Sequence, residues 1–225
     1  MTTSGTATFN LEFDDVISEA FERCGLEERD GYDMRTARRS LNLMFAEWAN
    51  RGLNLWTIEQ REVTMIAGQP EYTLPSDTVN VLSAVIRTNA GLQTQQDITI
   101  DRISQNEYLH LPNKYTPARP VQYYVQRTVP AKLFVYPTPP EGSPTYIFRY
   151  YGIRRIQDAG AFTNTADISF RFLPALCAGL AYHISVKKAP ERTVMLKQIY
   201  DEEFTRAAQE DRDIASVYLT PSFGR

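Results

Sequence analysis

Adjacent carboxylates are the first residues whose types suggest chemistry, in particular Asp14 with Asp15, Glu27 with Glu28, and Glu202 with Glu203. Two carboxyl groups about 5 to 9 Å apart are the catalytic machinery of glycoside hydrolysis. Consecutive residues of a helix do not face each other, so such pairs are poorly placed for joint catalysis. Capping of a helix start explains the first pair, with Asn10 or Asp14 as the expected N-cap. The carboxylate pairs therefore predict helix surfaces rather than an active site.

Histidine and cysteine occur only twice each in the chain. No Ser or Cys nucleophile motif accompanies His110 or His183, so we expect structural or surface histidines. Cys24 and Cys177 have no neighbouring ligand pattern and are expected to be buried reduced thiols, with a disulfide or reactive thiol as the alternative. The sequence also lacks the phosphate-loop, dinucleotide, nucleophile-elbow and zinc-protease motifs. We therefore expect that the protein is not an enzyme and has no catalytic residue, no cofactor and no metal.

Tyrosines and arginines interleave in the middle of the chain, where they could stack bases and hold phosphates in a single-strand groove. Strands with core aromatics on one face and polar residues on the other give the same pattern, and this interpretation is favoured. The formal charge of −3 also argues against a dedicated nucleic-acid clamp. The residues concerned are Tyr123, Tyr124, Tyr136, Tyr146, Tyr150 and Tyr151 with Arg119, Arg127, Arg149, Arg154 and Arg155.

Apolar residues recur at helical spacing in two segments before residue 56 and in two after residue 169. Gly25 is where a helix-ending glycine belongs, and Pro174 fits only in the first turn of a helix. Between these pairs, short β-branched and aromatic runs alternate with Gly, Pro and Asn, which predicts strands. The expected helices are 13–24, 34–48, 173–184 and 190–208, and the expected strands are 62–66, 79–87, 98–103, 121–127, 132–136 and 145–151.

The predicted fold is α+β, because two helix pairs flank a region of strands. Neither pair can bury both of its apolar stripes alone, so we expect the N- and C-terminal pairs to form one four-helix bundle. This discontinuous domain would comprise residues 1–55 and 157–212, with an antiparallel β sandwich or barrel inserted at 56–156. An extended C-terminal arm, 213–225, would follow. The longest weakly polar run is about half of the ~20 residues that cross a bilayer, so no membrane anchor is expected.

Two sets of residues are candidates for contacts between proteins. Arg35, Arg38 and Arg39 fall on one side of the second helix and either meet acids of a neighbouring subunit or face solvent. The arm carries apolar anchors but is too short to fold alone, so it either becomes ordered on a partner or is a frayed terminus. Its candidate residues are Tyr218, Leu219, Pro221, Phe223 and Arg225.

The chain resembles the head-to-tail adaptors of tailed bacteriophages, in particular tail tubular protein A and the packaged-DNA-stabilising adaptors of short-tailed phages. The segment 37–42, followed by 48–52 and Trp56, is similar to the family's second helix and its Arg-Gly turn. Segment 66–75 is similar to the first β hairpin, and 120–124 with 133–139 to a later one. Segment 172–176 is similar to the start of the third helix.

The resemblance implies a structural neck protein of the virion, made in the host cytoplasm during assembly. Such adaptors form a homo-oligomeric ring, usually of twelve subunits, that docks on the portal protein and helps to retain packaged DNA. They also provide the platform for the tail tube or nozzle protein, and double-stranded DNA passes without sequence-specific binding. The C-terminal arm would then be the portal-docking segment. The alternative is a virion-associated tail protein that degrades or binds cell-wall or capsule carbohydrate through its aromatic β region.

Overall fold

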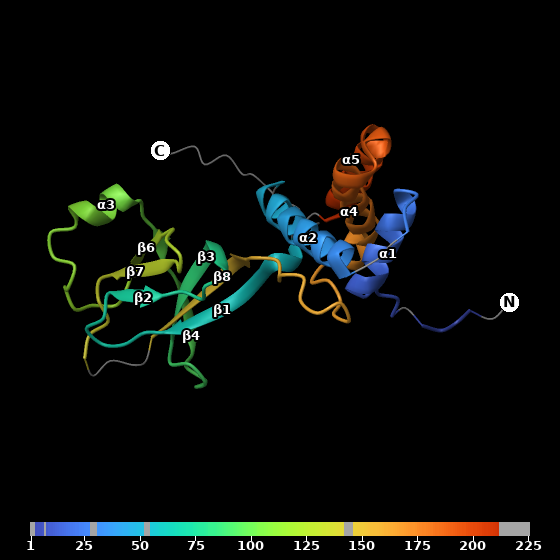
Figure 1. Cartoon of the computed structure of the whole chain (residues 1–225). Coiled ribbons are helices and arrows are strands. Elements are labelled where there is room, and N and C mark those ends of the chain that lie inside the picture. The colour runs from blue at the N-terminus through green and yellow to red at the C-terminus, as the bar shows by residue number, and fades with distance from the viewer. Residues whose placement is uncertain (1–2, 7, 28–30, 52–54, 142–145, 212–225) are drawn as a thin grey trace, which may run out of the picture. The chain divides into compact units, whose positions relative to one another are not determined.

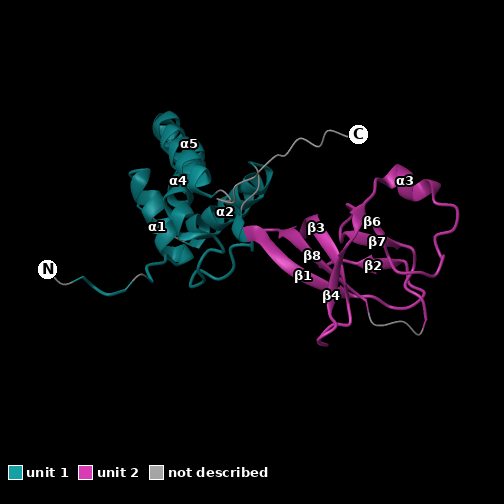
Figure 2. Cartoon of the chain, turned by 180° about the vertical axis from the view of Figure 1, so that it is seen from behind, with its two compact units in different colours: residues 1–56, 156–225 teal, residues 57–155 magenta. Residues whose placement is uncertain are grey.

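The computed structural model describes residues 3–6, 8–27, 31–51, 55–141 and 146–211. The chain divides into two compact units, Met1–Trp56 with Ile156–Arg225 and Thr57–Arg155, which we call the helical unit and the β unit (Figure 2). Helices and strands are both abundant, which confirms the predicted α+β class.

The helical unit contains α1 (Phe13–Arg23), α2 (Gly31–Arg51), α4 (Leu173–Lys188) and α5 (Thr193–Glu210) (Figure 1). Single 3-10 turns, η1 (Leu55–Thr57), η2 (Phe170–Phe172) and η3 (Pro190–Arg192), adjoin them. Gly25 follows α1 with a φ of +67°, which confirms the predicted helix-ending glycine.

The predicted N-cap of α1 was wrong, because the cap is Glu12 rather than Asn10 or Asp14. The Asp15 carboxylate accepts a hydrogen bond from the Glu12 N–H at 3.3 Å. The Phe13 N–H donates to the Asn164 carbonyl at 2.9 Å, so a distant loop satisfies the first turn. The start of α1 is therefore determined by tertiary structure as well as by local sequence.

Helix α4 is the centre of the helical unit and contacts α1, α2 and α5. Its buried residues lie on every side, as expected for a helix surrounded by others, rather than on the single predicted stripe. A Cβ atom at Gly179 would lie 2.5 Å from Met44 Sδ and 2.8 Å from Tyr200 Cε2. The absence of a side chain there lets α2 and α5 both approach the backbone of α4.

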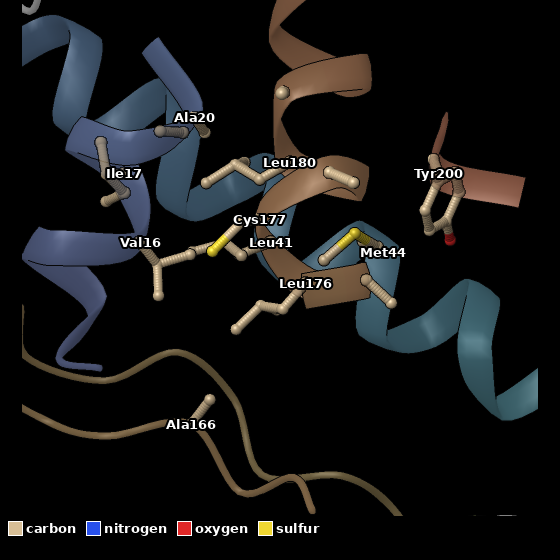
Figure 3. Packing of buried hydrophobic residues seen from close by; sticks show 14 of the residues in the cluster. Val16, Ile17, Ala20, Leu41, Met44, Ala166, Leu176, Cys177, Leu180 and Tyr200 are labelled. Atoms are coloured by element: carbon tan, nitrogen blue, oxygen red, sulfur yellow. The ribbon is translucent and has the colours of Figure 1, made fainter. Parts of the chain in front are cut away.

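The core of this unit joins all four helices. Val16 of α1, Leu41 of α2 and Cys177 of α4 meet in it (Figure 3). Trp48 of α2 is fully buried, and its indole Nε1 donates a 2.7 Å hydrogen bond to the Tyr200 hydroxyl of α5. This bond satisfies the polar atom that a buried indole carries into an apolar core.

The β unit consists of two four-stranded sheets and the short helix α3 (Gln105–His110). In the first, β1 (Ile58–Thr64), β8 (Ile147–Arg154), β3 (Thr78–Thr88) and β4 (Gln96–Thr99) are antiparallel neighbours in that order. The second has the order β2 (Glu71–Thr73), β7 (Lys132–Tyr136), β6 (Gln122–Gln126) and β5 (Asp101–Arg102).

One strand pair differs from the antiparallel arrangement expected from the sequence. Strands β5 and β6 are parallel, with Asp101 opposite Gln122 and Arg102 opposite Tyr123. A parallel pair needs a long crossover, which the segment containing α3 provides between these two strands. The sequence predicts antiparallel hairpins wherever turn residues separate two short strands. The long connection that makes β5 and β6 parallel has no comparable local motif, so the sequence does not predict it.

The two sheets share one apolar core, as in a β sandwich. Tyr123 of β6 and Phe148 of β8 meet with ring centroids 5.2 Å apart. In β6 and β7, buried residues alternate with half-buried ones, which is the period of a strand with one face on the core. The core is formed mainly by Tyr72, Val81, Ile86, Tyr123, Val125, Leu133, Val135, Phe148 and Tyr150.

Candidate interaction surfaces

The interleaved tyrosines and arginines of the β unit separate onto different surfaces. Tyr123 and Tyr150 are buried in the sandwich core, whereas Tyr151 is exposed. Arg149 Nε lies 3.0 Å from Glu62 Oε1, and Arg154 forms an ion pair with Glu59. Core packing explains Tyr123 and Tyr150, and carboxylates neutralise Arg149 and Arg154, so the arrangement favours alternating strand faces over a phosphate-binding groove.

A row of opposite charges crosses the outer face of the first sheet. Arg87 on β3 lies 2.7 Å from Asp97 on β4, and 3.8 Å from Glu62 on β1. Arg149 on β8 completes the row through its contact with Glu62. The guanidinium of Arg87 lowers the pKa of the Asp97 carboxyl group by hydrogen bonding. The row joins four strands by contacts between their side chains, and its charges compensate one another.

The three arginines of α2 have different surroundings. Arg38 is half-buried, its Nη1 donates to the Gly160 carbonyl at 3.3 Å, and its guanidinium lies 5.3 Å from the centre of the Phe162 ring. Arg35 is exposed and donates to the carbonyl of Gly31 in its own helix. Arg39 is exposed too, so Arg35 and Arg39 are the two whose charges are accessible for a contact with another subunit.

A second cation lies near Arg39. Lys187 of α4 donates to the Ser40 hydroxyl of α2 at 2.6 Å. Burial lowers the pKa of Lys187, and the charge of Arg39 lowers it further. Arg39 and Lys187 are therefore two cations close enough to repel each other.

A wide groove of 1080 Å³ lies beside α1 and the start of α4, and we call it the α1/α4 groove. Its apolar wall includes two strongly exposed aromatic side chains, Phe9 at 77% and Phe170 at 71% of full exposure. Sequence reasoning missed this site because two stretches that lie far apart in the chain, 9–23 and 170–177, form it. The lining residues are Phe9, Asn10, Leu11, Asp15, Ser18, Glu19, Glu22, Arg23, Phe170, Leu173, Pro174 and Cys177.

The edge of the α1/α4 groove along α1 is acidic. Three carboxylates, Asp15, Glu19 and Glu22, face one guanidinium, that of Arg23. Arg23 Nε lies 2.7 Å from Glu19 Oε1, so this pair is internally compensated. Asp15 and Glu22 leave the edge with a negative balance, which favours a partner that is apolar and carries positive charge.

The last described residues are held close to one end of this groove. The side chain of Arg171, next to Phe170, donates to the Glu210 carbonyl at 3.1 Å. The Asp211 carboxylate accepts a 2.9 Å hydrogen bond from the Leu55 N–H. These contacts fix the point from which the C-terminal arm leaves the helical unit. The arm residues Tyr218, Leu219, Pro221, Phe223 and Arg225 lie outside the described residues.

The two cysteines are both free and buried, as predicted. Burial raises the pKa of Cys24, and raises that of Cys177 to about 11. A thiol with a raised pKa is mostly protonated at neutral pH and is a poor nucleophile. Within the described parts of the chain, no cluster of three or more His, Cys, Asp or Glu side chains is arranged to hold a metal ion.

His183 of α4 lies against α2 and is three-quarters buried. Its Nε2 is 3.6 Å from Glu47 Oε2, which is beyond hydrogen-bond distance, and its ring centre is 5.1 Å from that of Tyr182. Burial lowers the pKa of His183, and Lys187 and Arg51 lower it further, although Glu47 opposes them. Its burial between α2 and the Tyr182 ring is consistent with the structural role expected from the sequence.

This environment predicts that acid destabilises the helical unit through His183. The unfolded chain binds a proton near pH 6.5 and the folded chain only at lower pH, so the free energy of unfolding falls as pH drops through this window. Between about pH 7.5 and about pH 5.5, His183→Gln should therefore lose less stability than the unmodified protein. Urea unfolding followed by tryptophan fluorescence measures this difference.

The exposed His110 of α3 provides the matched control for that prediction. His110→Gln should lose as much stability between the two pH values as the unmodified protein. Equal pH dependence of His183→Gln and His110→Gln would show that the burial of His183 has no role in acid sensitivity.

Comparison with known proteins identifies the family to which the chain belongs. Of the helices in the described ranges, none has both the length and the apolarity needed to cross a membrane. A search of curated proteins finds no match for the sequence. The family model of the SU10 adaptor protein matches residues 12–221, which span α1 through α5 and the whole β unit. The chain therefore belongs to the SU10 adaptor protein family, a family of phage adaptors.

Proposed function

We propose that the protein is a ring-forming head-to-tail adaptor in the neck of the virion. In this role it docks on the portal, helps to retain packaged DNA and provides the platform to which the tail tube or nozzle attaches. The observation that carries the proposal is the family match, which includes both helix pairs, the inserted β unit and most of the arm. A ring of identical subunits requires head-to-tail contacts that close by rotation.

The two units suit such a role in different ways. The helical unit exposes cations at Arg35 and Arg39 and an apolar groove with an acidic edge, so it has complementary features for contacts between copies. In the β unit, the charged row compensates its own charges. The formal charge of −3 suits a channel through which duplex DNA passes, because extensive phosphate neutralisation would hold the genome in place.

Native mass spectrometry of the protein with and without portal tests the proposal. We expect one closed complex with twelve adaptor copies, the number that resemblance to other adaptors implies. An adaptor that stays unbound, or that binds portal as scattered numbers of copies, would contradict the proposed ring. The measurement reports partner and copy number together.

Charge reversal at the exposed arginines tests the subunit contact in the same assay. Arg35→Glu combined with Arg39→Glu should weaken ring formation by about tenfold or more if these cations meet acids of a neighbour. Arg127→Glu with Arg155→Glu makes the same charge change at exposed positions of the β unit and serves as the control. Equal assembly of both double variants would exclude the arginines from the contact. Arg38 is left unchanged because it binds within its own subunit.

A further inference from the structure

We infer that, in the free protein, the chain's own C-terminal segment 214–223 docks in the α1/α4 groove. The groove belongs to the helical unit and is open, apolar and larger than most small-molecule sites. Phe9 and Phe170 are well exposed on it, and exposed aromatic side chains gathered along one groove mark a contact site. This docking concerns the protein before it meets any partner, and it does not depend on the proposed ring.

The composition of the segment matches the wall of the groove. Residues 214–223 contain Tyr218, Leu219 and Phe223 within a span of six residues. The groove offers the rings of Phe9 and Phe170 together with the apolar side chains of Leu11, Leu173 and Pro174. Aromatic anchors seated among aromatic and aliphatic side chains contribute most of the binding energy in such contacts. The groove therefore provides a site for the apolar side chains that the segment carries.

The C-terminal segment leaves α5 close enough to the α1/α4 groove to dock in the groove of its own molecule. Arg171 holds Glu210 beside η2, and the preceding residue, Phe170, lines the groove. An extended chain spans about 3.3 to 3.6 Å per residue, so the seven residues 212–218 reach about 23 to 25 Å. Because attachment keeps the segment close to the groove, its effective concentration there is high without a second copy.

Charge supports the same occupant. Asp15 and Glu22 leave the edge of the groove negative, since Glu19 is paired with Arg23. The residues that flank the docking segment include two cations, Arg212 and Arg225, and one carboxylate, Asp213. A segment with an apolar centre and an arginine on either side of it is complementary to an apolar groove with an acidic edge.

Hydrogen exchange of the full-length protein tests the inference in the absence of portal. The triple variant Tyr218→Ser, Leu219→Ser and Phe223→Ser should increase exchange of backbone amides in 15–23 and 170–177 by about threefold or more. Phe170→Ala, at an exposed position of the groove, should do the same to 15–23. Val194→Ser on α5, 81% exposed and outside the groove, is the control and should leave these amides unchanged.

Three outcomes would overturn the inference. Unchanged exchange in the triple variant would mean that the segment does not cover the groove. Protection that falls on tenfold dilution would mean that the segment comes from a second copy. Protection that appears only after portal is added would assign the groove to a portal element. Because the first two outcomes are measured on the adaptor alone, they leave the portal-binding test unaffected.

Discussion

Replacing Trp48 by alanine is expected to lower the free energy of unfolding of the helical unit by about 3 to 5 kcal/mol, the usual cost of truncating a buried aromatic side chain. Trp48 is fully buried, and its ring centre lies 5.6 Å from that of Phe172 and 5.4 Å from that of Phe204. The change also leaves the Tyr200 hydroxyl without its indole partner. Because domains are stable by only about 5 to 15 kcal/mol, this loss is large.

Urea unfolding measured by fluorescence checks this expectation. The second tryptophan of the chain, Trp56, remains as the probe, and its ring centre lies 4.5 Å from that of Phe172 in the same core. Leu43→Ala, on the same helix but 63% exposed, is the matched control and should change stability by less than about 0.5 kcal/mol. Equal losses for the two variants would contradict the central position of Trp48.

Tyr200→Phe separates the hydrogen bond from the packing. It keeps the ring in place but leaves the buried Trp48 N–H unpaired, at an expected cost of about 1 to 3 kcal/mol. Burial raises the pKa of Tyr200 to about 12, so the hydroxyl group stays protonated near neutral pH. A neutral effect of Tyr200→Phe would assign the whole loss in Trp48→Ala to packing.

Deleting residues 214–225 is expected to abolish binding to portal while leaving both units folded. The deleted residues lie beyond α5, so the described core of each unit keeps all of its residues. Aromatic anchors in an interface typically contribute about 2 kcal/mol or more each, so losing Tyr218 and Phe223 together should weaken binding by about a thousandfold. Co-sedimentation with portal and fluorescence unfolding measure the two quantities separately.

Single substitutions give this deletion its internal controls. Phe223→Ala and Tyr218→Ala should each weaken portal binding by about thirtyfold. Ser222→Ala, which changes a small side chain between the anchors, should bind like the unmodified protein. Full portal binding by the deletion variant would exclude the arm from docking, and a loss of stability would show that the arm also contributes to the helical unit.

The parts of the fold that depend on local sequence patterns could be predicted, and the parts that depend on tertiary contacts could not. The long helices were predicted because apolar side chains recur along them at helical spacing, and Gly25 ends α1 as expected. The start of α1 was not, because the carbonyls of Phe162 and Asn164 accept its first N–H groups. The centre of the helical unit was also missed, since the contact of Gly179 with Met44 and Tyr200 depends on tertiary packing.

The candidate surfaces also include residues that the sequence predicts and residues that only the folded structure reveals. Arg35 and Arg39 were recognised because they share one side of a helix, whereas the role of Arg38 depends on Gly160, far along the chain. The α1/α4 groove could not be predicted, because its residues come from the N-terminal segment, α1 and the start of α4. In the sequence, Asp15 and Glu22 look like ordinary residues of a solvated helix face. Only the folded structure shows that they line the same groove as Phe170.

The β unit is joined to the helical unit at both of its ends, so the chain couples the stabilities of the two units. Ile58 pairs with Ile153 across β1 and β8, so the two connections to the helical unit leave the folded β unit side by side. When the β unit unfolds, the helical unit must close a flexible loop of about a hundred residues, and the loop-closure entropy then costs it about 4 kcal/mol. A substitution in the sandwich core should thus lower the melting temperature of the helices as well, without any contact between the units.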